Sequence, residues 1–351
     1  MEFDKNQTIF ESADQKKIWK VGRKILPFDI TSVYITDPEM LEGCKQIYEF
    51  TMEWYGNMFA NPEIYKTNRN CYLSSEHFWH LIRTNANVSM SGNDWVVKDK
   101  NNHITAPSFF SVYDPLVRHG LTYEIIDKNT AVFRNEKYPL LLKYYKMFIE
   151  KCAKHPTGGY TFVYFCDFRI FKKGYKISLE DATLYRSDKD RNTFSLLENY
   201  LKERGCNFSV DNFLCINVTY KNENIMGIGI FPYKAEGDLS RVMINLNNKT
   251  NNGIDEYIIK RIEESPDKDE MINFIQRNIN CCNACGGKKH YTKRCGRWTD
   301  VFGRRLMLCG YYLAKRIKKN IETIEYTDYD MEMFKRVIEM RIDKIDIADL
   351  V

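Results

Sequence analysis

Four cysteines near the C-terminal end of this 351-residue chain have a spacing that is typical of a metal site. A close pair, Cys282 and Cys285, is followed by Cys295 and Cys309 within a polar stretch that contains several glycines. Zinc takes four soft or borderline ligands at tetrahedral corners, and a two-residue gap lets one tight turn present two thiolates to the same ion. Because four thiolates leave no open position for water, we predict a structural zinc ion rather than a catalytic one.

The ligand set has alternatives close by in the sequence. Cys281 could replace Cys282, and His290 could replace Cys309. An iron–sulfur cluster uses the same thiolates and is the second choice for the bound group. If these were ordinary reduced cysteines, the polar stretch would lack a source of order, whereas zinc binding in small finger peptides contributes roughly 10 to 16 kcal/mol.

Positive charge is concentrated in the same part of the chain. Residues 286–320 contain eleven Lys and Arg against one Asp, so the remainder of this chain of net charge +5 is acidic. Such a segment can attract nucleic acid or an acidic protein surface. We favour docking onto acids of the same chain, such as Asp267, Asp269 and Glu270. In the alternative, Tyr291 and Trp298 stack on bases. The cations that would then contact phosphates are Lys288, Lys289, Lys293, Arg294, Arg297, Arg304 and Arg305.

Two further charged residues, Asp167 and Arg169, follow an apolar run over 160–165. We predict that this run is a strand covered on both faces, and residues two apart point to the same side of an extended chain. A structural ion pair at the strand end is the favoured interpretation. The alternative is a ligand-binding pocket at Asp167 and Arg169, and with it an enzyme of unknown class.

Several short stretches resemble a known but uncharacterised protein family. They are Cys282–Lys288, Cys295–Asp300, Gly303–Arg305, Tyr326–Asp330, Tyr138–Tyr145 and Cys166–Arg169. On these residues the chain, from about Tyr138 onward, resembles the C-terminal half of a family of uncharacterised bacterial proteins. That family has no established activity, so the resemblance implies a metal-binding module attached to an α+β body and carries over no catalytic residue.

The elements that would position these residues follow from the pattern of apolar residues. Helical spacing predicts helices over 40–59, 135–154, 193–205, 254–263, 266–279 and 328–345. Strand patterns occur over 30–35, 94–98, 121–126, 130–134, 213–220, 225–231 and 241–246. Strands followed by helices, without strict alternation, predict an α+β fold with mixed or antiparallel sheets. We expect an N-terminal unit at 1–134, a central unit at 135–280 and a zinc module with a C-terminal helix at 281–351.

Composition restricts the class of protein further. Apolar residues make up 44% of the chain and charged residues 28%, which excludes a disordered or low-complexity protein. No apolar run approaches the roughly 18 residues needed to cross a bilayer, and the first residues lack the layout of a signal peptide. We therefore expect a cytoplasmic, non-enzymatic binding or regulatory protein that has no membrane contact and is stabilised by zinc.

Overall fold

The structure of the chain is a computed structural model, and the residues that it describes fall into two compact units. Unit 1 ends at Lys176, and unit 2 begins at Ile177. This division differs from the predicted units 1–134, 135–280 and 281–351, because the helix that follows residue 135 packs within unit 1. The described residues are 9–10, 23–61, 64, 86–99, 104, 107–155, 162–163, 165–185, 188–211, 215–229, 241–246, 254–281, 297–313 and 326–348.

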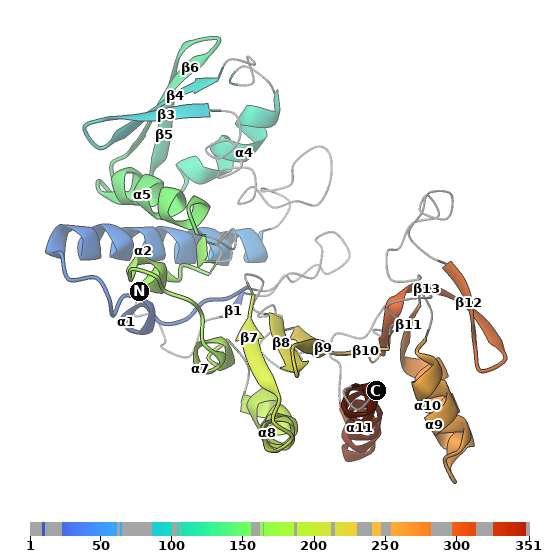
Figure 1. Cartoon of the computed structure of the whole chain (residues 1–351). Helices are drawn as coiled ribbons and strands as arrows, with labels where there is room; N and C mark the ends of the chain where they lie inside the picture. The colour runs from blue at the N-terminus through green and yellow to red at the C-terminus, as the bar shows by residue number, and fades with distance from the viewer. Residues whose placement is uncertain are drawn as a thin grey trace. The chain divides into compact units, whose positions relative to one another are not determined.

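Unit 1 contains a four-stranded antiparallel sheet in the order β3-β4-β6-β5 (Figure 1). The strands are β3 (Ala86–Ser91), β4 (Asp94–Asp99), β5 (Leu121–Asp127) and β6 (Thr130–Asn135). The helix α4 (Pro107–Val117) precedes β5, and the short strands β1 (Ile9–Phe10) and β2 (Arg23–Lys24) pair with each other. Three of the predicted strands are therefore confirmed, and the predicted α+β class is confirmed with antiparallel sheets.

Two helices pack against each other, and the second of them also packs against this sheet. They are α2 (Pro38–Ala60), which Asp37 caps by accepting a hydrogen bond from the Met40 amide at 2.7 Å, and α5 (Leu141–Ala153). A Cβ atom at Gly43 would lie only 2.0 Å from the ring of Tyr144, so the helices approach closely at this glycine. The indole of Trp95 donates a buried hydrogen bond to the carbonyl of Leu142 at 2.7 Å, which attaches the sheet to α5.

The prediction of a strand over 30–35 is wrong. The segment contains the short helix α1 (Phe28–Thr31) and a following turn. The hydroxyls of Thr31 and Ser32 both donate to the carbonyl of Phe28, at 3.3 and 2.7 Å. These local hydrogen bonds stabilise a helical turn instead of strand pairing. They outweigh the strand preference of the β-branched residues on which the prediction rested.

The prediction of a buried strand over 160–165 is also wrong, although its burial is confirmed for the described residues. Phe162 and Val163 are helical and only 2% exposed, and Phe165 lies in a turn. The amide of Asp167 donates to the carbonyl of Phe162 at 2.8 Å, which closes this turn. A short run that is apolar throughout cannot distinguish a buried strand from a buried helical turn.

Unit 2 is built on a seven-stranded antiparallel sheet in the order β11-β13-β10-β9-β8-β7, with β12 paired to β13. The strands β8 (Cys215–Tyr220), β9 (Glu223–Gly229) and β10 (Arg241–Asn245) confirm three predicted strands, and β8 and β9 form a hairpin. Sequence reasoning did not identify β7 (Asn207–Val210), β11 (Ile279–Cys281), β12 (Arg297–Val301) or β13 (Arg304–Leu313).

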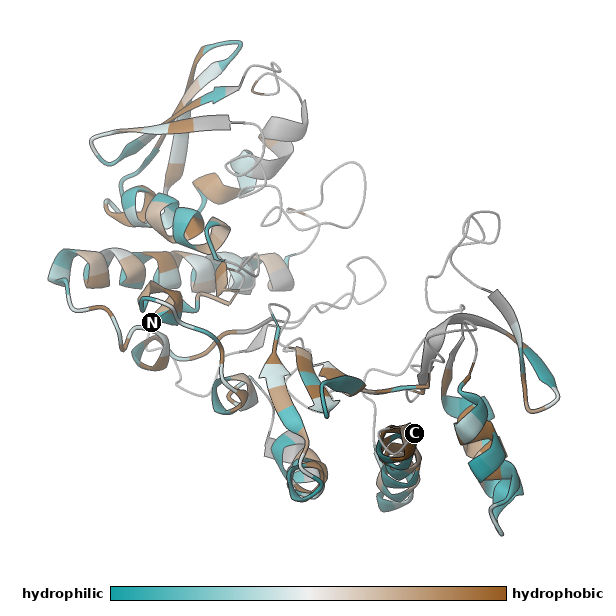
Figure 2. Ribbon diagram, viewed as in Figure 1, coloured by the Kyte–Doolittle hydropathy of each residue, from teal (hydrophilic) through white to brown (hydrophobic). Residues whose placement is uncertain are grey.

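In the described part of unit 2, five helices accompany this sheet. They are α7 (Leu179–Thr183), α8 (Asp188–Glu203), α9 (Glu256–Glu263), α10 (Lys268–Asn278) and α11 (Asp328–Ala348). Hydrophilic and hydrophobic residues alternate along these helices in Figure 2, as expected for helices with one buried face. The helix predicted over 328–345 is confirmed, and the hydroxyl of Thr327 caps it by accepting from the Asp330 amide at 3.1 Å. None of the helices in the described part of the chain is long and apolar enough to span a bilayer.

Candidate functional site

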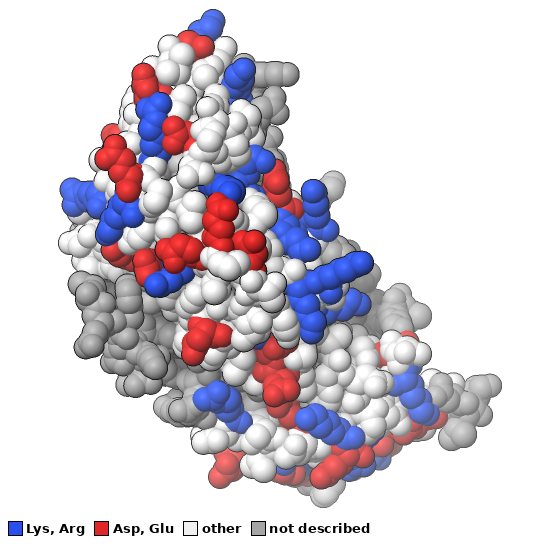
Figure 3. Space-filling view, turned by 90° about the vertical axis from the view of Figure 1, so that its left-hand side faces the viewer, with Lys and Arg blue, Asp and Glu red and all other residues white. Residues whose placement is uncertain are grey.

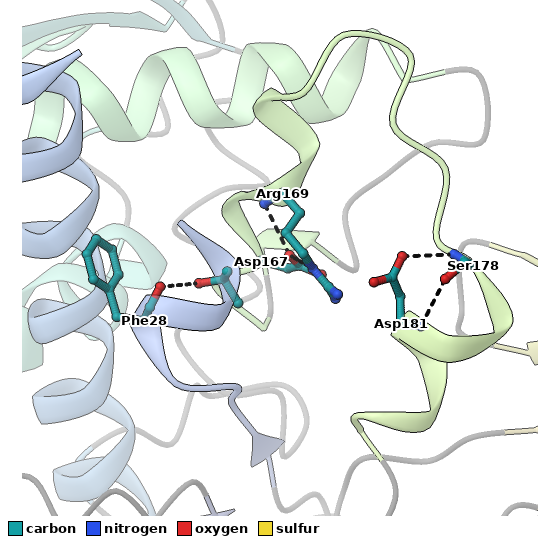
Figure 4. A network of polar contacts seen from close by, with 6 residues as sticks. Phe28, Asp167, Arg169, Ser178 and Asp181 are labelled. Atoms are coloured by element: carbon teal, nitrogen blue, oxygen red, sulfur yellow. Dashed lines mark hydrogen bonds and ion pairs between the residues drawn. The ribbon is translucent and has the colours of Figure 1, made fainter. Parts of the chain in front are cut away.

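Asp167 and Arg169 form a buried ion pair at the start of the short 3-10 helix η3 (Phe168–Phe171) (Figure 4). Asp167 is 1% exposed and Arg169 is 3% exposed. Arg169 Nε donates to Asp167 Oδ1 at 2.8 Å, and Nη2 donates to Oδ2 at 2.7 Å. Such a bidentate contact satisfies both oxygens of the carboxylate with donors of fixed geometry. The two charges therefore compensate each other, and the alternative role of the pair in ligand binding stays a prediction.

Further contacts within unit 1 hold the pair in place. The backbone amide of Arg169 donates to Asp167 Oδ1 at 3.2 Å, so the carboxylate also caps η3. The guanidinium of Arg169 lies 5.6 Å from the centre of the Tyr175 ring, a favourable cation–π position. Phe168, between the two charged residues, is fully buried against Phe148. These contacts indicate that the pair organises the core.

Cys166, directly before the pair, has an unusual backbone conformation. Its φ of 49° lies in the left-handed region that is uncommon for residues other than glycine. Burial raises the pKa of its thiol to about 12, against a smaller lowering effect of the hydrogen bond with Thr51. A thiol that is protonated at neutral pH is a poor nucleophile, so this residue has the chemistry of a core cysteine.

An open pocket of about 390 Å³ lies elsewhere in unit 1, where α2 begins and α5 ends. We call it the α2–α5 pocket. Its volume falls within the range of about 300 to 1,000 Å³ that is common for small-molecule sites. The lining residues are Tyr34, Ile35, Thr36, Asp37, Met40, Met147, Glu150, Lys151, Lys154 and Phe171.

The apolar part of the α2–α5 pocket is unusually accessible. Tyr34 is 41% exposed and Met147 is 36% exposed, and the neighbouring Val33 and Leu41 are 59% and 37% exposed. Two of the ten large apolar side chains that stand exposed in the described part of the chain thus line this pocket, and Val33 and Leu41 are adjacent in sequence to lining residues. Exposed apolar groups gathered around a hollow mark interaction sites, and methionine adapts well to bound apolar groups.

Firm contacts hold the aromatic side chains of this pocket. The centre of the Tyr34 ring lies 6.1 Å from that of the Tyr175 ring and 4.5 Å from Lys172 Nζ. Phe171 packs against Phe148, with 5.7 Å between the ring centres. The pocket wall is therefore largely preformed, which lowers the entropy that a ligand would lose on binding.

The charged groups of the pocket differ in the contacts that they already make. Asp37 Oδ1 already accepts the helix-capping bond, and Glu150 pairs with Lys146 one turn away. Within the described part of the chain, Lys151 and Lys154 form no ion pair. On the face drawn in Figure 3, basic residues gather in small groups among acidic ones, without a continuous basic surface. At Lys151 and Lys154 the pocket thus has positive charge, unpaired within the residues that the structure describes, beside apolar surface.

A second pocket, of about 540 Å³, lies in unit 2 between α9, α10 and the β12–β13 hairpin. Its lining includes Glu263, Asp269 and Asp300 beside Lys268. Asp300 Oδ1 accepts a hydrogen bond from the Gly303 amide at 2.9 Å, which supports the turn of the hairpin. This pocket is more acidic than the α2–α5 pocket, and it adjoins the strands that flank the predicted metal segment.

Most of the predicted zinc site lies outside the described residues. Cys282, Cys285 and Cys295 are not described, and Cys309 is described only as a backbone position of β13. His290 also lies outside, whereas the backbone of Cys281 ends β11. Among the side chains that are described, no group of three or more His, Cys, Asp or Glu is placed to hold a metal ion.

The strand register nevertheless places the two ends of the 282–296 segment on either side of the same β13 residue. Cys281 of β11 pairs with Leu308 of β13, and Arg297 of β12 pairs with Leu308 as well. Neighbouring strands lie about 4.8 Å apart. The chain on either side of the segment therefore meets β13 directly beside the backbone of Cys309.

Only the end of the predicted basic surface is described. Lys288, Lys289, Lys293 and Arg294 lie outside the described residues, and Arg297 is described as a backbone position of β12. Arg304 and Arg305 are exposed at the start of β13. Arg305 pairs across the hairpin with Asp300, and opposite charges at such positions favour each other. Contact with nucleic acid stays a prediction.

Comparisons with family models, with curated proteins and with solved structures find no match to this chain. The resemblance to an uncharacterised bacterial family therefore stays a prediction. Function has to be inferred from the geometry of the described residues.

Sequence reasoning missed the α2–α5 pocket, because its residues come from three separate parts of unit 1. One signal was present: Met147, Lys151 and Lys154 follow one another at intervals of four and three, which places them on one face of a helix. The missed β12–β13 hairpin also had a signal. Phe302 and Gly303 both have positive φ, as the two-residue turns of hairpins require, and glycine in such a turn is a known hairpin marker.

Proposed function

We propose that this chain is a non-enzymatic binding or regulatory protein whose unit 2 is stabilised by a structural zinc ion. The observation that carries the metal proposal is the register at Leu308, where β11 and β12 meet β13 beside Cys309. Cys282 follows β11 by one residue, and Cys295 precedes β12 by two. Both ends of the 282–296 segment therefore lie next to β13 at this point. This arrangement suits a four-thiolate site that takes ligands from both ends of the segment and from Cys309.

The binding role is supported by the α2–α5 pocket, where Lys151 and Lys154, without an ion-pair partner in the described part of the chain, lie beside exposed apolar surface. Such a lining suits holding an anionic, partly apolar molecule. We place the protein in the cytosol. In the described part of the chain Cys44, Cys152, Cys166, Cys206 and Cys215 are free thiols, which fits a reducing compartment.

Metal analysis of the protein, purified without a histidine tag, tests the zinc proposal. We expect about one zinc ion per chain, and loss of zinc in the double variant Cys282→Ser/Cys285→Ser. Cys206→Ser removes a cysteine elsewhere in unit 2 and should leave the zinc content unchanged. Less than about one zinc per ten chains in the unaltered protein would contradict the proposal, as would full zinc content in the double variant. Iron with absorption near 400 nm would point instead to an iron–sulfur cluster.

A second measurement separates the binding role from nucleic-acid recognition. We expect a random-sequence oligonucleotide to show no salt-dependent binding at low ionic strength. Affinity that falls steeply as salt rises would instead indicate that cations of the 286–320 segment contact phosphates.

A further inference from the structure

We infer that the α2–α5 pocket binds an amphiphilic organic anion, with its carboxylate or phosphate head at Lys151 and Lys154 and its apolar body against Tyr34 and Met147. This inference rests on the proposed binding role and gives it a site and a class of ligand.

Helix geometry brings the head-group residues together. Lys151 and Lys154 are three positions apart at the end of α5, and residues at this spacing are neighbours on a helix surface. Cations are favoured in the last turn of any helix by its dipole, so their position is not by itself a sign of a site. The distinguishing feature is that both lysines line a hollow and have no ion-pair partner in the described part of the chain.

The acidic residues of the lining do not cancel this charge equally. Asp37 faces the free amides of the first turn of α2, and its Oδ1 accepts from Met40 at 2.7 Å. Glu150 is 52% exposed and pairs with Lys146, which lies outside the pocket lining. The lining carries two acids and two bases, and an anionic head is therefore attracted at the end of α5, where Lys151 and Lys154 have no ion-pair partner in the described part of the chain. Hydrogen bonds between ionised groups are roughly twice as strong as neutral ones.

The apolar side of the pocket gives the ligand its second property. A simple inorganic anion would make no use of the exposed side chains of Tyr34 and Met147, or of Met40 and Phe171 beside them. An aliphatic or aromatic body would cover this surface, and each buried methylene contributes about 0.8 kcal/mol. Cationic ligands are disfavoured by the lysines, and neutral ones leave the lysines without a new partner. The combination selects an anion that carries an apolar body.

Isothermal titration of the full chain with octanoate and with octyl phosphate tests this inference. We expect saturable binding of at least one of the two, with the tighter one identifying the preferred head group. We expect binding at least tenfold weaker, or none, for octyltrimethylammonium and octanol, which carry the same chain without the negative charge. Equal binding of all four probes would overturn the inference, and so would the absence of octanoate and octyl phosphate binding at millimolar concentration.

Variants locate the binding. Lys151→Ala/Lys154→Ala should weaken binding of the anionic probes about tenfold or more, and Lys151→Arg/Lys154→Arg should restore most of it. The control Lys202→Ala/Lys260→Ala removes the same charge from exposed positions of unit 2 and should bind as the unaltered chain does. Met147→Glu places a negative charge against the apolar body and should abolish binding.

Unchanged affinity in the alanine double variant, or equal loss in the control, would overturn the inference. Circular dichroism of each variant verifies that the fold is retained. Because zinc content is measured separately, loss of the zinc proposal with intact octanoate binding, or the reverse, tells which of the two proposals has failed.

Discussion

Two charged regions of unit 1 differ in how their charges are used. At Asp167 and Arg169, one acid and one base are almost fully buried and face each other in a bidentate contact. In the α2–α5 pocket, Lys151 and Lys154 stand beside open space without an ion-pair partner among the described residues. In both regions, charged residues lie near apolar ones. The comparison teaches that unmatched charge beside accessible surface, rather than buried charge, marks the candidate site.

The largest effect on stability is expected when the ion pair of Asp167 and Arg169 is disrupted. Asp167→Asn leaves the guanidinium of Arg169 buried without its counter-charge, so we expect a loss of about 3 to 5 kcal/mol in the free energy of unfolding. Urea denaturation measures it. Arg134→Gln, in the exposed contacts with Asp94 and Glu124, is the control and should cost at most about 1 kcal/mol. Equal effects of the two changes would show that the buried pair is not the structural element proposed here.

A smaller effect is expected where the two pocket-forming helices meet. Gly43→Ala would place a methyl group 2.0 Å from the ring of Tyr144, and overpacking of this kind costs about 1 to 3 kcal/mol. The higher helix propensity of alanine returns up to about 1 kcal/mol. We therefore expect net destabilisation in urea denaturation, together with weaker octanoate binding. At Gly227 an added Cβ meets nothing closer than 3.5 Å, and Gly227→Ala should leave octanoate binding unchanged. Full stability and binding in Gly43→Ala would contradict the close helix contact.

Unit 1 also contains a buried titratable residue, His119, whose surroundings shift its pKa. Burial lowers its pKa most strongly, Lys137 and Arg118 lower it further, and Glu53, whose Oε2 lies 3.9 Å from Nδ1, raises it. The unfolded chain therefore takes up a proton at higher pH than the folded chain. Stability should be fully present above about pH 6.5 and decline as the pH falls through the lowered folded pKa.

Urea denaturation between pH 8 and pH 5 measures this decline. His119→Gln should flatten the part of the curve below about pH 6.5, because the variant has no proton to take up at this position. An identical pH dependence in the two proteins would show that other groups are responsible.

The smallest effect on stability is expected at the rim of the pocket. Glu150→Gln removes an exposed i,i+4 pair with Lys146, which is worth at most about 0.5 kcal/mol. The same change takes a negative charge from the pocket lining, so octanoate should bind about twofold more tightly. Glu264→Gln disrupts the equivalent pair with Lys260 in unit 2 and should leave octanoate affinity unchanged. Tighter binding in both variants would mean that net charge, not the pocket, sets the affinity.

Local signals in the sequence predicted much of the fold. Ser178 followed three positions later by Asp181 is a sequence signature of a helix start, and the structure has this capping box at α7 (Figure 4). The strands β8 and β9 follow the predicted strand patterns. The predictions of strands over 30–35 and 160–165 were wrong, because the described residues of both runs lie in short helices and turns. Local composition cannot report whether a partner strand exists.

The candidate site was harder to predict, for a physical reason. Tyr34, Met147 and Phe171 are brought to one pocket by the packing of α2 on α5 and of η3 on α5, and no local pattern encodes that packing. The ion pair of Asp167 and Arg169 could be anticipated, because the two residues are neighbours in sequence. Its closed geometry could not, since that depends on the turn at Cys166.

A crystal structure of the protein with 8-bromooctanoate tests the central claim most directly, because the anomalous signal of bromine locates the ligand without bias. The predicted result is a bromine peak against Tyr34 and Met147, with the carboxylate within hydrogen-bond distance of Lys151 or Lys154. An empty α2–α5 pocket at a saturating ligand concentration, or a carboxylate directed away from both lysines, would contradict it.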